Sequence, residues 1–250
     1  MAMNRTVLVF GASGGIGSAL CKTLSSNDDR VIGVARNEEK LLSLKNDGAL
    51  TDYRVCDITQ PQEVALLFQN LKEENVPFSG VAHCVGSITL KPIHILKDED
   101  FAQSLQTNLW CVFYTLRASV KYWLGEKSSG RFVACSTAAA SIGLPNHEAI
   151  AAAKSGLEGM LVSAAATYAN KNIFINAVAP GLIDTPLSEK IVKSEPALAA
   201  SLNMHAIKRV GRPEDVASAM EWLLDERQSW ITGQVIKVDG GLSGLKTVAS

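Results

Sequence analysis

Short apolar runs alternate with longer segments of helical periodicity along most of the chain. Runs rich in β-branched residues predict strands, because such side chains pack well on a pleated, half-buried surface. The predicted strands span Thr6–Phe10, Val31–Val34, Tyr53–Val55, Gly80–His83, Arg131–Cys135, Ile173–Ala177 and Val235–Val238. Apolar residues recur at helical spacing in the intervening segments, which are Gly15–Ser26, Glu38–Asn46, Pro61–Glu74, Asp98–Lys127, Glu148–Asn170 and Pro213–Asp225.

This alternation predicts an α/β fold: a doubly wound parallel sheet of about seven buried strands with helices on both faces. Parallel neighbours need crossover connections, and right-handed crossovers give the arrangement found in Rossmann-type folds. The sequence contains no internal repeat and no linker, so residues 1–250 are interpreted as a single domain.

One long segment shows no clear periodicity. It covers residues 182–211 and contains Pro186 and Pro196. Long irregular segments in compact domains often serve as lids or binding loops, so we interpret this one as a substrate lid. Its apolar residues predict a largely hydrophobic small molecule as substrate; they are Leu182, Leu187, Ile191, Leu198 and Met204.

Composition limits the classes of partner. Hydrophobic residues make up 47% of the chain and charged ones 20%, as in ordinary globular proteins, and the net charge is −1. That charge gives no electrostatic reason to expect nucleic acid or an anionic membrane as partner, and no apolar run approaches the ~20 residues of a membrane-spanning helix. The five cysteines are scattered without a Cys-x-x-Cys pair or a His/Cys cluster. This pattern favours reduced thiols, no metal site and a cytoplasmic location.

The first predicted strand runs directly into a glycine-rich segment that opens a helix, with the sequence Gly-Ala-Ser-Gly-Gly-Ile-Gly. Its first glycine permits a tight turn, and the missing side chains of the later glycines let the backbone approach a pyrophosphate. The N–H groups and partial positive charge of the helix N-terminus then face the phosphates. We therefore predict dinucleotide binding, with contacts from Gly11, Ser13, Gly15, Ile16 and Gly17.

The end of the second predicted strand bears on the choice of nucleotide. In NAD-preferring sites an acidic side chain there binds the ribose hydroxyls and repels a 2′-phosphate. This chain instead has Ala35 and then Arg36, whose guanidinium can pair with a phosphate in bidentate fashion and stack on adenine. The charge argument favours NADP(H), with NAD(H) as the alternative cofactor. The competing interpretation of Arg36 is a solvated surface arginine.

Together with further motifs, the glycine turn resembles that of the short-chain dehydrogenase/reductase family, and the resemblance covers nearly the whole chain. The similar segments are Gly11–Gly17, Cys56–Ile58, His83–Gly86, Asn176–Thr185, Arg209–Ala217 and Ile231–Gly241. The segment His83–Gly86 departs from the family's usual Asn-Asn-Ala-Gly, since only the glycine is retained. The resemblance implies an NAD(P)-binding Rossmann domain and oxidoreductase activity.

The resemblance also implies cofactor contacts. Asp57 is the expected acceptor for the adenine amino group, with Ile58 beside it. Asn108 matches the structural asparagine of the family's active site. On the nicotinamide side the implied contacts are Gly86, Asn108, Lys154, Pro180, Gly181, Ile183 and Thr185.

The family's working residues are a serine after the fifth strand and a Tyr-x-x-x-Lys pair on the next helix. By the resemblance Lys154 is that lysine, while Thr137 stands at the serine position beside Ser136. Ile150 occupies the tyrosine position, and an alkyl group neither donates nor accepts a proton. General acid help is worth about 10²–10⁴ in rate, so ordinary ketone reduction should be severely impaired. The candidate catalytic residues are Asn108, Ser136, Thr137 and Lys154.

Three interpretations of Ile150 stay open. In the first, the chain reduces a small apolar substrate, a conjugated enone, imine or carbonyl compound, by chemistry that does not need the phenol. In the second, another side chain supplies the proton, with His147, Tyr114 and Tyr122 as candidates. In the third, the chain is a catalytically silent NADP(H)-binding sensor or partner subunit. The retained lysine, asparagine and nicotinamide loop favour an active oxidoreductase.

The long helical segments at 108–127 and 148–170 also predict assembly. The second is rich in alanine, glycine and serine, and small residues allow helices to approach closely. Members of the resembled family usually form dimers or tetramers through these two helices. We therefore expect a homodimer or homotetramer.

Overall fold

The computed structural model describes residues 5–246. All seven predicted strands are present, and they form one parallel sheet in the order β3-β2-β1-β4-β5-β6-β7. The strands are β1 (Thr6–Phe10), β2 (Arg30–Ala35), β3 (Asp52–Val55), β4 (Gly80–His83), β5 (Gly130–Cys135), β6 (Ile173–Pro180) and β7 (Val235–Val238).

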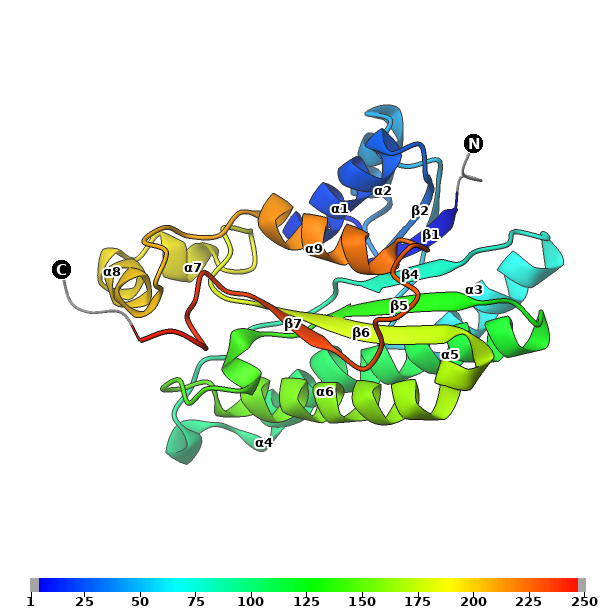
Figure 1. The fold of residues 1–250 in the computed structure, drawn as a ribbon. Coiled ribbons are helices and arrows are strands. Elements are labelled where there is room, and N and C mark those ends of the chain that lie inside the picture. The colour runs from blue at the N-terminus through cyan, green and yellow to red at the C-terminus, as the bar shows by residue number, and fades with distance from the viewer. Residues whose placement is uncertain (1–4, 247–250) are drawn as a thin grey trace.

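Helices cover both faces of this sheet (Figure 1). One face carries α1 (Gly15–Ser26), α2 (Glu38–Asn46) and α9 (Pro213–Leu224). The other carries α3 (Pro61–Glu73), α5 (Cys111–Gly125) and α6 (Glu148–Tyr168). The doubly wound Rossmann-type fold expected from the sequence is confirmed.

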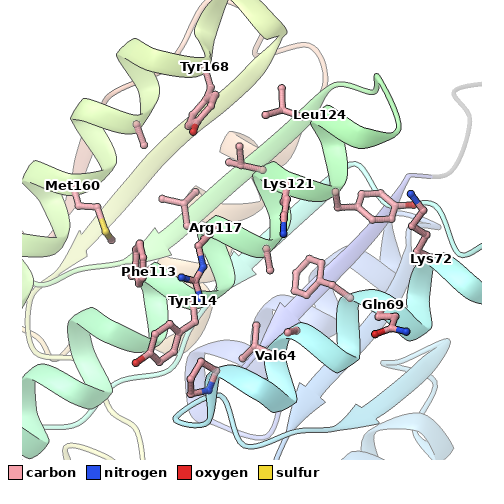
Figure 2. A pocket seen from close by; sticks show the side chains of 18 residues that line it. Val64, Gln69, Lys72, Phe113, Tyr114, Arg117, Lys121, Leu124, Met160 and Tyr168 are labelled. Atoms are coloured by element: carbon pink, nitrogen blue, oxygen red, sulfur yellow. The ribbon is translucent and has the colours of Figure 1, made fainter.

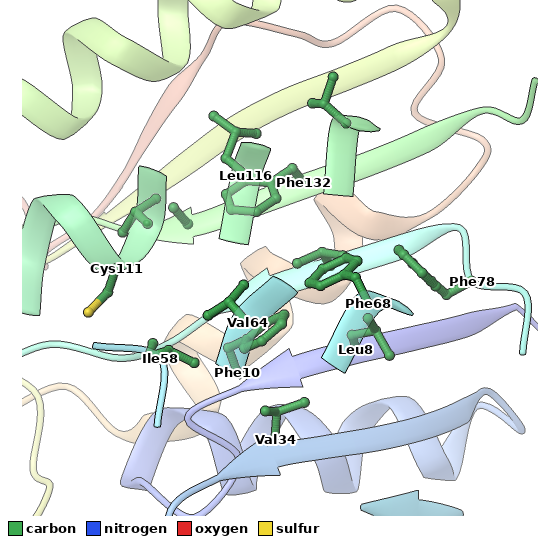
Figure 3. Close-up of a cluster of buried hydrophobic side chains, with 14 of the residues drawn as sticks. Leu8, Phe10, Val34, Ile58, Val64, Phe68, Phe78, Cys111, Leu116 and Phe132 are labelled. Atoms are coloured by element: carbon green, nitrogen blue, oxygen red, sulfur yellow. The ribbon is translucent and has the colours of Figure 1, made fainter. Parts of the chain in front are cut away.

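Strand β1 shows how the two hydrophobic cores are built. Successive side chains of a strand point to opposite faces of the sheet. Accordingly, Val7 and Val9 pack with α1 and α9, while Leu8 and Phe10 pack with α3 and α5. Figure 3 shows Phe10 beside Phe68 of α3, and their rings stack with centroids 6.2 Å apart.

The expectation that all seven strands are buried is wrong at the two edges of the sheet. The edge strands β3 and β7 are only partly buried, whereas β1, β4 and β5 are buried throughout. An edge strand has a neighbour on one side only, so less of it is covered.

The long helix predicted at Asp98–Lys127 is divided into three parts. They are α4 (Asp98–Leu105), one π-helical turn (Gln106–Trp110) and α5. Asn108 lies in the π turn and not in a continuous α-helix over Asp98–Lys127. Such turns are rare and occur frequently at functional sites.

The segment 182–211, predicted to be irregular, contains α7 (Glu189–Val192) and α8 (Glu195–Met204). Pro196 stands in the first turn of α8, where a missing N–H costs nothing. Both helices are too short to give a clear periodic signal. The remaining elements are 3₁₀ turns at Ile93–Ile95, Ala138–Ala140 and Ala169–Lys171.

Two tryptophans at opposite extremes of burial test the account of the core. Trp123 is fully buried and its indole N–H donates to the Phe78 carbonyl at 3.0 Å, whereas Trp230 is 98% exposed. We predict that Trp123→Ala lowers the free energy of unfolding by about 3–5 kcal/mol because it leaves a cavity. Trp230→Ala, the matched control, should change it by less than about 0.5 kcal/mol. Urea unfolding of both variants measures this, and equal effects would contradict the assignment of the core.

Candidate cofactor-binding and active site

The glycine turn lies at the point where strand order reverses, between β1 and β4. Ligands of open α/β sheets bind in the crevice at such a point. Gly11 has a positive φ of 81°, and a Cβ on Gly17 would lie 2.1 Å from the Gly11 carbonyl oxygen. The turn therefore excludes side chains at these positions. Helix α1 starts at Gly15, so its first N–H groups, which lack intrahelical partners, face the crevice.

The predicted nicotinamide-side loop touches this turn. A Cβ on Gly15 would lie 2.7 Å from Cγ2 of Thr185, close to the ring of Pro186. Two segments about 170 residues apart in sequence thus pack against each other, and the absence of a side chain at Gly15 is what permits their contact.

The residues predicted to bind the adenosine end lie at the same edge of the sheet. Arg36 follows β2 and is exposed, with no ion-pair partner among residues 5–246. One Asp57 oxygen, Oδ1, accepts hydrogen bonds from the Thr59 N–H at 3.0 Å and the Thr59 hydroxyl at 2.9 Å. These bonds orient the carboxylate and leave Oδ2 available for another donor. Ile58 is buried beside it.

Asn108 is fully buried and orders the loop that follows β4. Its Oδ1 accepts from the Ser87 N–H at 3.0 Å. Its Nδ2 donates to the Ser87 hydroxyl and to the Ser104 carbonyl, both at 3.0 Å. A Cβ on Gly86 would lie 3.2 Å from Asn108 Oδ1 and 3.8 Å from Lys154 Nζ. Three residues predicted for the nicotinamide side therefore converge from three separate segments: the loop after β4, the π turn and α6.

Lys154 projects from α6 into this cluster and is only 4% exposed. Its Nζ donates to the carbonyl oxygen of Cys135, the last residue of β5, at 2.6 Å. Burial lowers the pKa of this ammonium group below its usual value. An ammonium has three donors, so two remain for a ligand or for water.

Ile150 lies one helical turn before Lys154 and is buried, at 5% exposure. Thr137, which precedes the 3₁₀ turn, accepts a hydrogen bond from the Ala139 N–H at 3.3 Å and keeps its own proton available. The Ser136 hydroxyl instead donates to Glu158 of α6 at 2.6 Å. Of these two predicted catalytic hydroxyls, Thr137 is therefore the one whose O–H can donate a hydrogen bond to a substrate.

Comparison with known proteins places this geometry in a family. Residues 11–243 match the family model described as enoyl-(acyl carrier protein) reductase. The 3-oxoacyl-[acyl-carrier-protein] reductase FabG of Rickettsia felis is 34% identical over 242 residues, which cover 95% of this chain and 96% of the relative. The chain belongs to the short-chain dehydrogenase/reductase family. It is an oxidoreductase of this family, as the motifs predicted, and the family binds NAD(P)(H).

Solved structures of the family agree over nearly the whole chain. A short-chain type dehydrogenase/reductase from Mycobacterium ulcerans superposes with a TM-score of 0.90 and 30% identity, covering 96% of this chain and 90% of that one. The structure titled ElxO with NADP bound gives a TM-score of 0.88 at 25% identity, covering 96% and 99%.

By the sequence resemblance, Ile150 is predicted to stand at the position of the family's proton-donating tyrosine, so the positions of the three alternative donors matter. Tyr122 donates to the carbonyl of Val76, which precedes β4 and lies at the opposite, amino edge of the sheet. Tyr114 lies in an outer groove between α3, α5 and α6 (Figure 2). His147 caps α6 at the carboxyl edge, with Nδ1 2.7 Å from the Pro145 carbonyl. Of the three, only His147 stands at the edge that carries the site.

Sequence reasoning missed two residues that fasten the predicted lid. Ser188 is buried, accepts from the Thr185 N–H at 3.1 Å and bonds to the Ile183 carbonyl. His205 joins the two ends of the segment: its Nδ1 bonds to the Ser201 carbonyl at 2.7 Å, and its Nε2 accepts from the Leu182 N–H at 3.4 Å. A serine three residues after a loop threonine was the available signal for Ser188, whereas the contacts of His205 are set by the tertiary fold.

Two further findings concern the sequence-based exclusions. Within residues 5–246, no helix has the length and apolarity needed to cross a membrane. Within the same residues, no group of three or more His, Cys, Asp or Glu side chains is arranged so that it could hold a metal ion.

Proposed function

We propose that this chain is an NADP(H)-dependent reductase that holds its cofactor ready for hydride transfer to a small apolar substrate without the family's tyrosine. The observation that carries the proposal is the convergence of buried Lys154 and Asn108 on Gly86, with Ile150 one turn away. Residues 1–250 would form one cofactor-binding domain, with 182–211 as its lid.

The residues present fit a dinucleotide. A Cβ at Gly11, Gly15 or Gly17 would clash with neighbouring protein atoms, so the glycines permit the tight turn that presents the first N–H groups of α1 to a pyrophosphate; Ser13 and Ile16 belong to the same turn. Asp57 Oδ2 suits the adenine amino group. On the nicotinamide side Lys154 would hold the ribose, while Pro180, Gly181, Ile183 and Thr185 line the loop facing the ring. The bound cofactor would supply the hydride.

Arg36 supports the preference for NADP(H). It is exposed, has no ion-pair partner within the described residues 5–246 and follows Ala35, an alanine at the position where NAD-preferring sites carry an acidic side chain. The NADP found with the structural relative ElxO is consistent with this choice.

The absence of an acid at Ile150 bears on the substrate class. Hydride addition to an iminium ion gives a neutral amine, and conjugate addition to an enone gives an enolate that solvent protonates. Neither reaction needs a phenol, and Thr137 can donate a hydrogen bond to an oxygen of the substrate. The relatives named 3-oxoacyl-[acyl-carrier-protein] reductase make a carbonyl compound the alternative.

Apolar side chains at the carboxyl end of the sheet favour a hydrophobic substrate. In Figure 1, α7 and α8 lie at the same end of the molecule as α4. Exposed apolar residues occur in the segment that leads from β4 to α4 and along the proposed lid; they are Ile88, Leu90, Ile93, Ile95, Leu187, Met204 and Ile207. A charged substrate would gain little from such surroundings.

Removal of Arg36 tests the cofactor preference. We predict that Arg36→Ala weakens NADPH binding about 10- to 100-fold, the value of a charge-assisted pair, and leaves NADH binding unchanged. Titration followed by nicotinamide fluorescence measures both constants. Lys22→Ala, which removes an exposed positive charge from α1, is the control. Tighter binding of NADH than NADPH by the parent would overturn the assignment.

Restoring the phenol tests the chemistry. We predict that Ile150→Tyr raises the rate of ketone reduction about 10²–10⁴-fold over the parent, because a general acid is regained. Ile150→Phe supplies the ring without the hydroxyl and should give no gain. A parent that already reduces ketones as fast as Ile150→Tyr would refute the proposal. A parent that binds NADPH fully yet turns over no substrate class would instead favour a silent sensor or partner subunit.

We also propose self-assembly through the outer face of α5 and α6. A groove of about 1010 Å³ lies there, with α3 as its third wall. Figure 2 shows Phe113, Tyr114, Met160 and Tyr168 around it. Leu124 and Val162 are exposed nearby on the same two helices. A second copy would cover this apolar surface.

Light scattering tests the assembly. We predict a mass of about two or four times the 26.7 kDa of one chain. Met160→Glu, which puts a charge into the groove, should lower the mass toward that of one chain, because an unpaired charge is costly in an apolar interface. A parent mass near 26.7 kDa would contradict the proposal.

A further inference from the structure

Glu158 of α6 has no assigned role and lies against the site. It follows Lys154 by four residues and Ile150 by eight, a spacing that places all three on one side of the helix. Its Oε1 accepts the hydrogen bond from the buried Ser136 hydroxyl at 2.6 Å. The Ser136 N–H in turn donates to the Val178 carbonyl of β6 at 2.7 Å. Glu158 is thus tied to the segment that carries Thr137.

Other titratable groups around Lys154 come from three further elements. They are His83 and the Cys84 thiol at the end of β4, Cys135 of β5 and Cys111 of α5. Burial lowers the pKa of His83 to about 3, so its ring is neutral at physiological pH. Burial raises the pKa of all three thiols, to about 12 for Cys111, so they carry no charge. The carboxylate of Glu158 is therefore the negative charge in this set.

This charge opposes the effect of burial on the ammonium. Burial lowers the pKa of Lys154, while smaller Coulombic effects of Cys135, Cys84, Cys111 and Glu158, in that order, raise it. The backbone carbonyl of Cys135 accepts one of the three N–H groups but carries no net charge. Ile150 contributes no polar atom from the preceding turn. Glu158 lies one turn later on the same helix face, and its carboxylate binds Ser136, the residue that follows Cys135, whose carbonyl binds Lys154.

We propose that Glu158 is a positioning residue, which holds Lys154 in its charged form and, through Ser136, fixes the start of the segment bearing Thr137. The inference rests on the proposed role of Lys154 in holding the nicotinamide ribose. Glu158 acts through these neighbours and makes no contact of its own with substrate.

The pH dependence of NADPH affinity tests the inference. In the parent, affinity should fall as rising pH removes the Lys154 proton. Glu158→Gln keeps the size of the side chain and an acceptor for Ser136 but removes the charge, so the pKa of Lys154 falls further. The loss of affinity should then occur at a pH lower by roughly half a unit or more. Glu158→Asp should restore part of the difference.

Glu73→Gln is the matched control. It makes the same charge change on the exposed surface of α3 and should leave the pH profile of NADPH binding where it is in the parent. A Glu158→Gln profile that coincides with those of the parent and Glu73→Gln would overturn the inference.

A second readout needs no cofactor. In protein labelled with ¹³C-lysine, the Lys154 signal, assigned by its loss in Lys154→Arg, should titrate at lower pH in Glu158→Gln than in the parent. An unchanged midpoint rejects the role of Glu158 even where NADPH binds. A parent that binds no NADPH contradicts the proposed function instead. The lysine titration then still tests whether Glu158 raises the pKa of Lys154. If Glu158→Gln does not fold, the same comparison is made with Glu158→Asp, whose shorter side chain moves the carboxylate and whose midpoint should therefore lie below that of the parent.

Discussion

A lysine ammonium group buried at the carboxyl edge of a parallel sheet is the constraint around which this site is arranged. Burying a charge costs several kcal/mol unless neighbouring groups compensate. Here Lys154 receives a hydrogen-bond acceptor from the end of β5 and a carboxylate from the next turn of its own helix. Ile150, one turn earlier on the same helix, offers this charge no polar atom. In the proposed function the charge holds the nicotinamide ribose.

The parallel sheet explains why distant segments meet at that charge. The carboxyl ends of β1, β4, β5 and β6 lie together, so the segments that follow them share one crevice. The glycine turn follows β1, Gly86 and Ser87 follow β4, and Thr137 follows β5. The loop after β6 then crosses to the glycine turn, where Thr185 packs on Gly15. Each of these contacts depends on a strand register that the two hydrophobic cores specify.

The features that local pattern encodes were predictable. Alternating apolar runs located all seven strands, and the glycine turn was recognisable because tight backbone contact leaves few other residues possible at Gly11 and Gly17. The π turn at Asn108 was not, because one extra residue in a helix hardly alters its periodicity. The hydrogen bond between Ser136 and Glu158 could not be predicted either, since it joins residues 22 positions apart in the sequence. The helices α7 and α8 were not predicted, because they are too short to give a clear periodic signal.

The most direct test of the central claim compares two substrates that share a ring skeleton. NADPH oxidation is followed with a cyclic iminium ion and with the corresponding cyclic ketone. If hydride transfer proceeds without a general acid, the iminium ion is reduced and the ketone reacts at least about 10²-fold more slowly. Equal rates for the two substrates would show that a proton donor is present after all, and would contradict the account of a site built on Lys154 without a phenol.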